Sequence, residues 1–168
     1  MEKTNLIKIL KLFVRRGNFI LSSLIPTDIY FDLKEAYGNP RILNSLADCV
    51  YELIDKRVTC VAGKGFGGMP LATAISSRHN LELTLIRDMQ KEYGTKKLIE
   101  AHIPTRKDKI AIVDDVFTTG ASLKGAIKTL EISEVSEGKI VQCCVIVKRG
   151  EGELKYPWSY LINLEELL

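Results

Sequence analysis

The sequence predicts an α/β domain in which helices cover both faces of a parallel sheet, preceded by an N-terminal appendage. Four short apolar runs occur along the chain, and stretches with apolar residues at helical spacing separate them. An acidic pair followed by hydroxyl residues stands at the end of the third run. Strands that alternate with helices are joined by right-handed crossovers, so they run parallel and are buried on both faces. The four runs are 58–62, 81–86, 109–113 and 140–147.

Length and composition favour one domain spanning residues 1–168. The chain has 168 residues, of which 46% are hydrophobic, which suits a single core. Its net charge of +3 arises from 24 basic and 21 acidic residues and is too small to indicate a nucleic-acid partner. No apolar stretch is long enough to span a membrane, and the lysine-rich residues 1–16 lack a signal-peptide pattern. We therefore expect a cytoplasmic protein with neither nucleic acid nor membrane as a partner.

The four cysteines and two histidines do not predict a metal site. Cys49, Cys60, Cys143 and Cys144 lack the paired short spacings of zinc ligands, so we expect buried, reduced thiols. The histidines are far apart in the sequence, which favours surface or packing roles. Tyr156 and Trp158 are interpreted as core or edge aromatics. The histidines are His79 and His102.

The N-terminal part differs in pattern from the rest. Apolar residues at helical spacing predict a helix over Asn5–Val14 that Gly17 ends. This helix is amphipathic and basic, so membrane binding is an alternative, but we interpret its apolar face as packed on the domain. Residues 19–33 mix short apolar pieces with serine, proline and aspartate, which indicates an irregular, strand-like segment. Asn39 and Pro40 then predict the start of a second helix, which reaches Ile54.

Two segments between the predicted strands have the composition of functional loops. The glycine-rich residues 63–68 follow the first apolar run and precede a helical stretch. Residues 87–107 are polar and too long for an ordinary connection, and loops of that length are usually functional. We therefore expect a mobile loop at about residues 87–107.

The segment Asp114–Ser122 has the chemistry of a sugar-phosphate site. It lies at the carboxyl end of a predicted strand and before a helix predicted at Ala121–Ile132, which is where ligands bind in open parallel sheets. Its hydroxyls, glycine backbone and helix N-terminus form a phosphate cradle. The two carboxylates would repel a phosphate but accept hydrogen bonds from ribose hydroxyls. The alternative is structural: Asp115 caps the following turn and the threonines form its hydrogen bonds.

The segment Ile110–Ser122 resembles the phosphoribosyl-binding motif of the type I phosphoribosyltransferases. That resemblance implies their fold, a parallel sheet of about five strands flanked by helices, with a small hood from residues 17–35 and the C-terminal segment. Further segments extend the resemblance along nearly the whole chain, and it is greatest to the orotate phosphoribosyltransferases. These segments are 19–23 with 30–33 (hood), 62–72 (diphosphate loop), 87–95 with 98–100 (mobile loop), 148–152 (orotate-carboxylate turn) and 160–168 (final segment).

This resemblance implies a reaction and a set of site residues. Orotate and phosphoribosyl diphosphate would give orotidine 5'-monophosphate and diphosphate, with Mg²⁺ bound mainly by substrate oxygens and by no direct protein ligand. The mobile loop would reach a neighbouring subunit's site, so at least a homodimer is implied. The catalytic residues would be Lys91, Asp114 and Asp115. Substrate would be bound by these aspartates and by Lys64, Gly65, Arg87, Thr118, Thr119, Gly120, Ala121, Ser122 and Arg149, where the Arg149 guanidinium suits a planar carboxylate.

The sequence departs from the family pattern at three places, which leaves alternatives open. Residues 23–27 lack a glycine and a lysine of the hood, Asp88 stands for a basic residue, and Tyr93 stands for a histidine. Lys64, Lys96 or Lys97 could compensate for the lost charge. One alternative is a transferase for another base, such as a 6-oxopurine, and the other is a non-catalytic protein that binds phosphoribosyl diphosphate or nucleotide. From the residues alone, Lys91, Lys96 and Lys97 also fit a solvated charge run, and Arg149 fits a turn partner.

Overall fold

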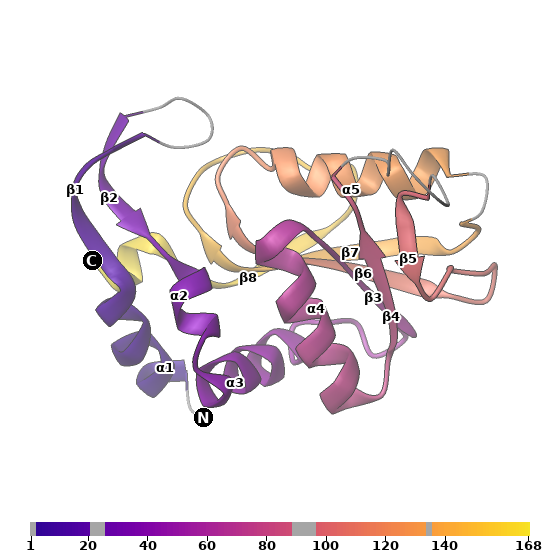
Figure 1. The fold of residues 1–168 in the computed structure, drawn as a ribbon, viewed down its shortest axis with the longest axis horizontal. Helices are drawn as coiled ribbons and strands as arrows, with labels where there is room; N and C mark the ends of the chain where they lie inside the picture. The colour runs from indigo at the N-terminus through magenta and orange to yellow at the C-terminus, as the bar shows by residue number, and fades with distance from the viewer. Residues whose placement is uncertain (1–2, 21–25, 89–96, 134–135) are drawn as a thin grey trace.

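The computed structural model describes residues 3–20, 26–88, 97–133 and 136–168. Within them the chain forms a six-stranded sheet and a separate two-stranded hairpin (Figure 1). The sheet has the order β5-β4-β3-β6-β7-β8. The four predicted runs form β3 (Cys60–Lys64), β4 (Glu82–Ile86), β6 (Lys109–Phe117) and β7 (Lys139–Lys148), and these pair in parallel as neighbours in the sheet. The predicted fold class is confirmed.

The sheet extends by one strand at each edge beyond the four runs. At one edge β8 (Trp158–Asn163) pairs in parallel with β7. At the other edge β5 (Ile99–Ala101) pairs antiparallel with β4. The prediction of a loop over 87–107 was therefore wrong at residues 99–101, because Ile99 pairs with Ile86 and is buried. Part of the predicted loop, residues 89–96, lies outside the described residues.

Alternating side chains of the sheet fill two cores, one on each face. Val61, Ala111 and Val113 pack with α3 (Pro40–Tyr51) and α4 (Gly65–His79), whereas Ala62 and Ile112 pack with α5 (Ala121–Ile132). Figure 1 shows α5 on the opposite side of the sheet from α3 and α4. Asn39 caps α3 by accepting a hydrogen bond from the Arg41 amide, as its sequence position predicts. Successive side chains of each central strand thus face opposite sides of the sheet and are buried on both, as in a parallel sheet covered on both faces.

The N-terminal helix ends earlier than predicted. Helix α1 covers Lys3–Leu10 and is followed by a 3-10 turn, η1 (Lys11–Phe13). The expected extension to Val14 was wrong, because β1 (Val14–Ile20) begins there and pairs antiparallel with β2 (Pro26–Phe31). Gly17 lies inside β1 and does not end the helix. Leu6 and Leu10 are fully buried, so the packing interpretation of α1 is confirmed.

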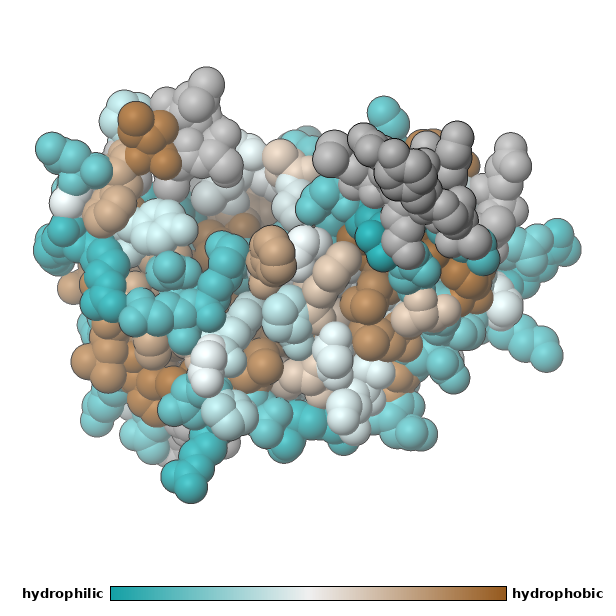
Figure 2. Space-filling model, in the orientation of Figure 1, coloured by the Kyte–Doolittle hydropathy of each residue, from teal (hydrophilic) through white to brown (hydrophobic). Residues whose placement is uncertain are grey.

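The hairpin and a short helix form one side of the molecule beside the sheet. Helix α2 (Leu33–Tyr37) follows β2 and contacts both α3 and α4. The C-terminal 3-10 turn η2 (Leu164–Leu167) contacts α1, and Figure 1 shows the C-terminus beside this hairpin. The face drawn in Figure 2 has hydrophilic residues interspersed with apolar ones.

The remaining global expectations concern cysteines and membranes. Cys60, Cys143 and Cys144 are buried free thiols, as predicted, whereas the free thiol of Cys49 is only partly buried. Burial raises the pKa of the Cys143 thiol to about 12, which keeps it protonated and unreactive. Among the described residues, no helix is both long and apolar enough to cross a membrane.

Candidate active site

A cavity of about 720 Å³ opens at the carboxyl ends of the central strands. The last residue of β3, the end of β6 and the turn after β7 border it on the sheet side, and β2 and α2 border it on the other. The position is the one expected for a ligand site in a parallel sheet. The lining residues that sequence analysis predicted are Lys64, Gly65, Asp114, Asp115, Thr118, Thr119, Gly120, Ala121, Ser122 and Arg149.

One predicted site residue, Arg87, does not line this cavity, and another, Lys91, lies outside the described residues. The Arg87 guanidinium donates from Nε to Glu100 Oε1 at 3.0 Å, across the β4–β5 edge, and Arg87 is not among the lining residues. Lys91 lies outside the described residues, as do Tyr93 and Lys96. Their assigned roles stay predictions.

The loop before α5 has the geometry that the sequence predicted for a phosphate cradle. Gly120 caps α5 in the left-handed conformation, with φ of 76°, and its carbonyl accepts the Lys124 amide at 2.8 Å. A Cβ at Gly120 would come within 2.7 Å of the Phe117 ring, so a side chain there would disrupt the turn. Ala121 and Ser122 begin the helix, whose first turn contains no acidic residue. Backbone N–H groups at this helix start and the helix dipole favour an anion.

The acidic pair occupies the last part of β6. Asp114 is buried, with 5% exposure, and accepts hydrogen bonds from Ser122 and from the Asp115 amide, the latter at 2.9 Å. Burial, and then the negative charge of Asp115, raise the pKa of Asp114 to about 7. Asp115 accepts the Val116 amide at 2.8 Å, but the cap of α5 is Gly120. Helix α5 is thus capped by Gly120 and not by Asp115, and the carboxyl of Asp114 stays partly protonated near neutral pH.

Glycines allow α4 to approach the acidic pair closely. Gly65 starts α4 with φ of 61°, and Gly67 packs so tightly that a Cβ would lie 2.4 Å from Asp115 Oδ1. The Tyr37 hydroxyl of α2 donates to the Gly67 carbonyl at 3.2 Å. Burial, and next the negative charges of Asp115 and Asp114, raise the pKa of Tyr37 well above its usual range, so it remains a donor. Residues 62–72 are thus in contact with both β6 and α2.

Among the described residues, three cationic side chains reach the cavity from different elements. Lys64, at the end of β3, places Nζ 3.3 Å from Asp88 Oδ1. Lys34, on α2, places Nζ 3.6 Å from Asp115 Oδ2. Arg149, after β7, donates from Nη2 to the Ile29 carbonyl of β2 at 2.7 Å, and burial lowers its pKa. Arg149 thus links the end of the sheet to the hairpin as well as lining the cavity, so it is more than a local turn partner.

The chain is similar in sequence to known phosphoribosyltransferases. Residues 33–162 match the phosphoribosyl transferase domain family. The chain is 39% identical over 139 residues to the orotate phosphoribosyltransferase of Methanothermobacter thermautotrophicus, covering 83% of this chain and 74% of that protein. It is 39% identical over 153 residues to the enzyme of the same name from Methanocaldococcus jannaschii, covering 90% and 85%. The chain belongs to the phosphoribosyltransferase family.

Solved structures agree with this assignment. The orotate phosphoribosyltransferase of Mycobacterium tuberculosis superposes with a TM-score of 0.80 at 26% identity, covering 98% of both chains. That of Aeropyrum pernix superposes with a TM-score of 0.79 at 26% identity, covering 97% of this chain and 96% of the other. The predicted resemblance to the orotate phosphoribosyltransferases is confirmed.

Several lining residues of this phosphoribosyltransferase were not named as site residues from the sequence. Lys34 directly follows the hood segment 30–33 that was quoted for the resemblance, so its position was a usable signal. Asp88 was noted only as a departure from the family pattern. The exposed aromatic ring of Phe66 had no signal beyond its place in the glycine-rich segment. The lining residues Ile20, Tyr30, Phe31, Gly67, Val116 and Phe117 lie in segments that were predicted to form the site but were not named individually, and Leu123 was not predicted.

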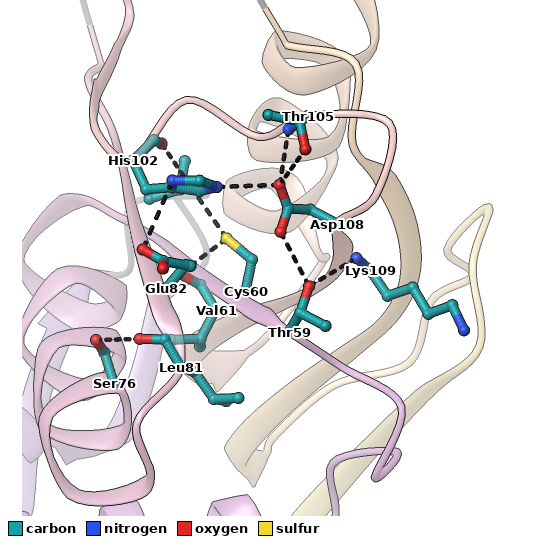
Figure 3. A network of polar contacts seen from close by, with 11 residues as sticks. Thr59, Cys60, Val61, Ser76, Leu81, Glu82, His102, Thr105, Asp108 and Lys109 are labelled. Atoms are coloured by element: carbon teal, nitrogen blue, oxygen red, sulfur yellow. Dashed lines mark hydrogen bonds and ion pairs between the residues drawn. The ribbon is translucent and has the colours of Figure 1, made fainter.

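A second polar network holds the opposite, amino ends of the strands together (Figure 3). Asp108 accepts hydrogen bonds from Thr59, Thr105 and His102 at 2.8–3.0 Å. Burial alone would raise the pKa of Asp108, but these hydrogen bonds outweigh it and lower the pKa to about 2. His102 also lies 3.6 Å from Glu82. The predicted packing role of His102 fits this network, and His79 likewise stacks on Tyr51.

Proposed function

We propose that the chain transfers the phosphoribosyl group of phosphoribosyl diphosphate to orotate, forming orotidine 5'-monophosphate and diphosphate. One observation carries the proposal: the acidic pair, the hydroxyl loop and Arg149 line one cavity of about 720 Å³. A carboxylate pair, an anion cradle and a guanidinium together suit a sugar phosphate and a planar carboxylate. The names of the relatives point to the same substrates.

The sugar phosphate would bind between β6 and α5. The 5'-phosphate accepts hydrogen bonds from the Thr118 and Thr119 hydroxyls and from N–H groups at the start of α5. Asp114 and Asp115 accept hydrogen bonds from the ribose hydroxyls. Because positive charge builds on the ribose as its bond to diphosphate breaks, the neighbouring carboxylates stabilise that charge.

The base and the leaving group would bind at opposite sides of the ribose. Arg149 donates two parallel hydrogen bonds to the orotate carboxylate, which orients the attacking ring nitrogen. Lys64 and the backbone of Gly65 face the diphosphate, whose negative charge grows during the reaction. Lys91 from the predicted mobile loop would close over this group and exclude water.

Magnesium is proposed to accompany the diphosphate, with its charge neutralised by oxygens of the substrate. Among the described residues, no group of three or more His, Cys, Asp or Glu side chains could hold a metal ion. Among the described residues, the carboxylates at the end of β6 are Asp114 and Asp115, and so small a donor set fits a cation bound chiefly through substrate oxygens. When bound, the cation would reduce the negative charge of the leaving group. We also propose that the active form is at least a homodimer, since the loop is assigned to a neighbouring site.

A panel of bases tests the proposal. The chain is incubated with phosphoribosyl diphosphate, Mg²⁺ and either orotate, uracil, hypoxanthine, guanine or adenine, and released diphosphate is measured. Of the five bases, only orotate should support turnover, and the Arg149→Ala variant should have a much higher KM for orotate. Turnover of a purine without orotate would replace this proposal with the oxopurine alternative. Binding of phosphoribosyl diphosphate without turnover of any base would indicate a non-catalytic protein.

A further inference from the structure

We propose that Asp88 competes with the diphosphate for Lys64: its carboxylate pairs with the Lys64 ammonium in the cavity, and diphosphate displaces it. The inference rests on the proposed function, because it assigns regulation to the leaving-group side of that same site. It starts from a single contact, in which Lys64 Nζ lies 3.3 Å from Asp88 Oδ1. Both residues line the cavity.

The two partners differ in their freedom to move. The Lys64 side chain is only 18% exposed, whereas that of Asp88 is 70% exposed. The Lys64 ammonium is held against α5, where a Cβ at Gly125 would lie 2.9 Å from Nζ. When this ion pair separates, the Asp88 carboxylate is therefore exposed to water, whereas the Lys64 ammonium stays largely buried. Because an exposed ion pair is weak, Asp88 is the partner that moves.

The Asp88 carboxylate also lies where an anion is favoured. Lys64 is the N-cap of α4, a helix of 15 residues whose first turn contains no acidic residue. Asp88 Oδ2 lies 3.7 Å from the position that a Cβ on Gly65 would take. It therefore sits beside the start of the same helix and the same ammonium that the proposed diphosphate would use. A multiply charged diphosphate outcompetes one carboxylate at such a site, but it must first replace it.

Neutralising Asp88 tests this competition. Binding of inorganic diphosphate is measured by calorimetry on the full chain, with and without Mg²⁺, for the wild type and Asp88→Asn. The variant should bind diphosphate about threefold to tenfold more tightly, since the competing ion pair and the local repulsion are both removed. Diphosphate should also inhibit the forward reaction more strongly in Asp88→Asn, by a similar factor.

Two further variants separate a specific effect from a general change of charge. Glu52→Gln removes the same charge from a pair of matched geometry, since Glu52 is 73% exposed and lies 3.4 Å from Lys56, away from the cavity. Its diphosphate affinity should equal that of the wild type. In a Lys64→Met background the gain from Asp88→Asn should be clearly smaller, because no ammonium remains to be released and only the relief of repulsion is left.

Each result decides between distinct conclusions. Unchanged or weaker diphosphate binding by Asp88→Asn overturns the inference, and weaker binding only with Mg²⁺ would identify Asp88 as a contact of the cation. An equal gain in the Lys64→Met background would also overturn it, because Asp88 would then act without Lys64. If the wild type binds neither diphosphate nor phosphoribosyl diphosphate, the proposed function fails together with the inference.

Discussion

Replacing Asp114 with asparagine should make the folded chain progressively more stable than the wild type as the pH rises from about 5 to about 8. In the folded state the pKa of Asp114 is raised from 3.8 to about 7 by burial and by Asp115. The unfolded chain ionises at the ordinary value, so stability from this group is present below about pH 4 and is lost as the pH rises through the folded pKa. Asparagine has a similar shape and does not titrate.

The size of the effect follows from the two pKa values. Their separation corresponds to a limit of about 4 kcal/mol, and roughly 2–3 kcal/mol of it falls between pH 5 and pH 8. Urea unfolding at several pH values, followed by circular dichroism, measures the free energy of unfolding for the wild type, Asp114→Asn and the exposed control Glu52→Gln. Subtracting the curves removes the titration of all other groups. A difference that stays constant with pH, or that favours the wild type at high pH, would refute the reasoning.

Three further substitutions, two in the cavity and one in the predicted mobile loop, are tested by steady-state kinetics. Arg149→Ala should raise the KM for orotate by about tenfold to a hundredfold, the value of a charge-assisted hydrogen bond, and equal effects on both substrates would count against its role. Gly67→Ala places a Cβ 2.4 Å from Asp115 Oδ1, so we expect a higher KM for phosphoribosyl diphosphate and a loss of about 1–3 kcal/mol in urea unfolding; unaltered values would mean that α4 can move. Lys91→Ala should chiefly lower kcat, and an unchanged rate would remove its catalytic assignment.

Much of the fold was predictable because local patterns and tertiary structure agree. The strands β6 and β7 contain four or more consecutive apolar residues, β3 and β4 contain shorter apolar stretches, and α5 spans Ala121–Ile132 as predicted. The strand β5 was not predictable, because a three-residue segment has no period of its own and Ile99 is buried only by pairing with β4. The start of β1 at Val14 was missed for a related reason. The apolar spacing of α1 continues to Val14, but pairing with Phe31 makes that residue extended.

The site was predictable where its residues are adjacent in the chain. Asp114–Ser122 combines a strand end, a glycine turn and a helix start, so one short segment predicts both chemistry and position. The ion pairs Lys34–Asp115 and Lys64–Asp88 join different elements, and no spacing in the sequence encodes the distances between those elements. The same limit applies to Arg149, whose bond to the Ile29 carbonyl joins β7 to the hairpin.

The charge balance of the cavity links these contacts to substrate binding. Among the described lining residues, the cations Lys34, Lys64 and Arg149 face three carboxylates. Two of the cations already pair with carboxylates, and Asp114 carries a proton part of the time near neutral pH. A substrate with several negative charges therefore enters a cavity whose cations are engaged internally, and it must exchange these contacts for its own. Since Lys34 comes from α2 and Arg149 contacts β2, exchange at either residue changes how the hairpin side is held against the sheet. Binding of a negatively charged substrate is thus coupled to the position of the hairpin through the contacts of Lys34 and Arg149.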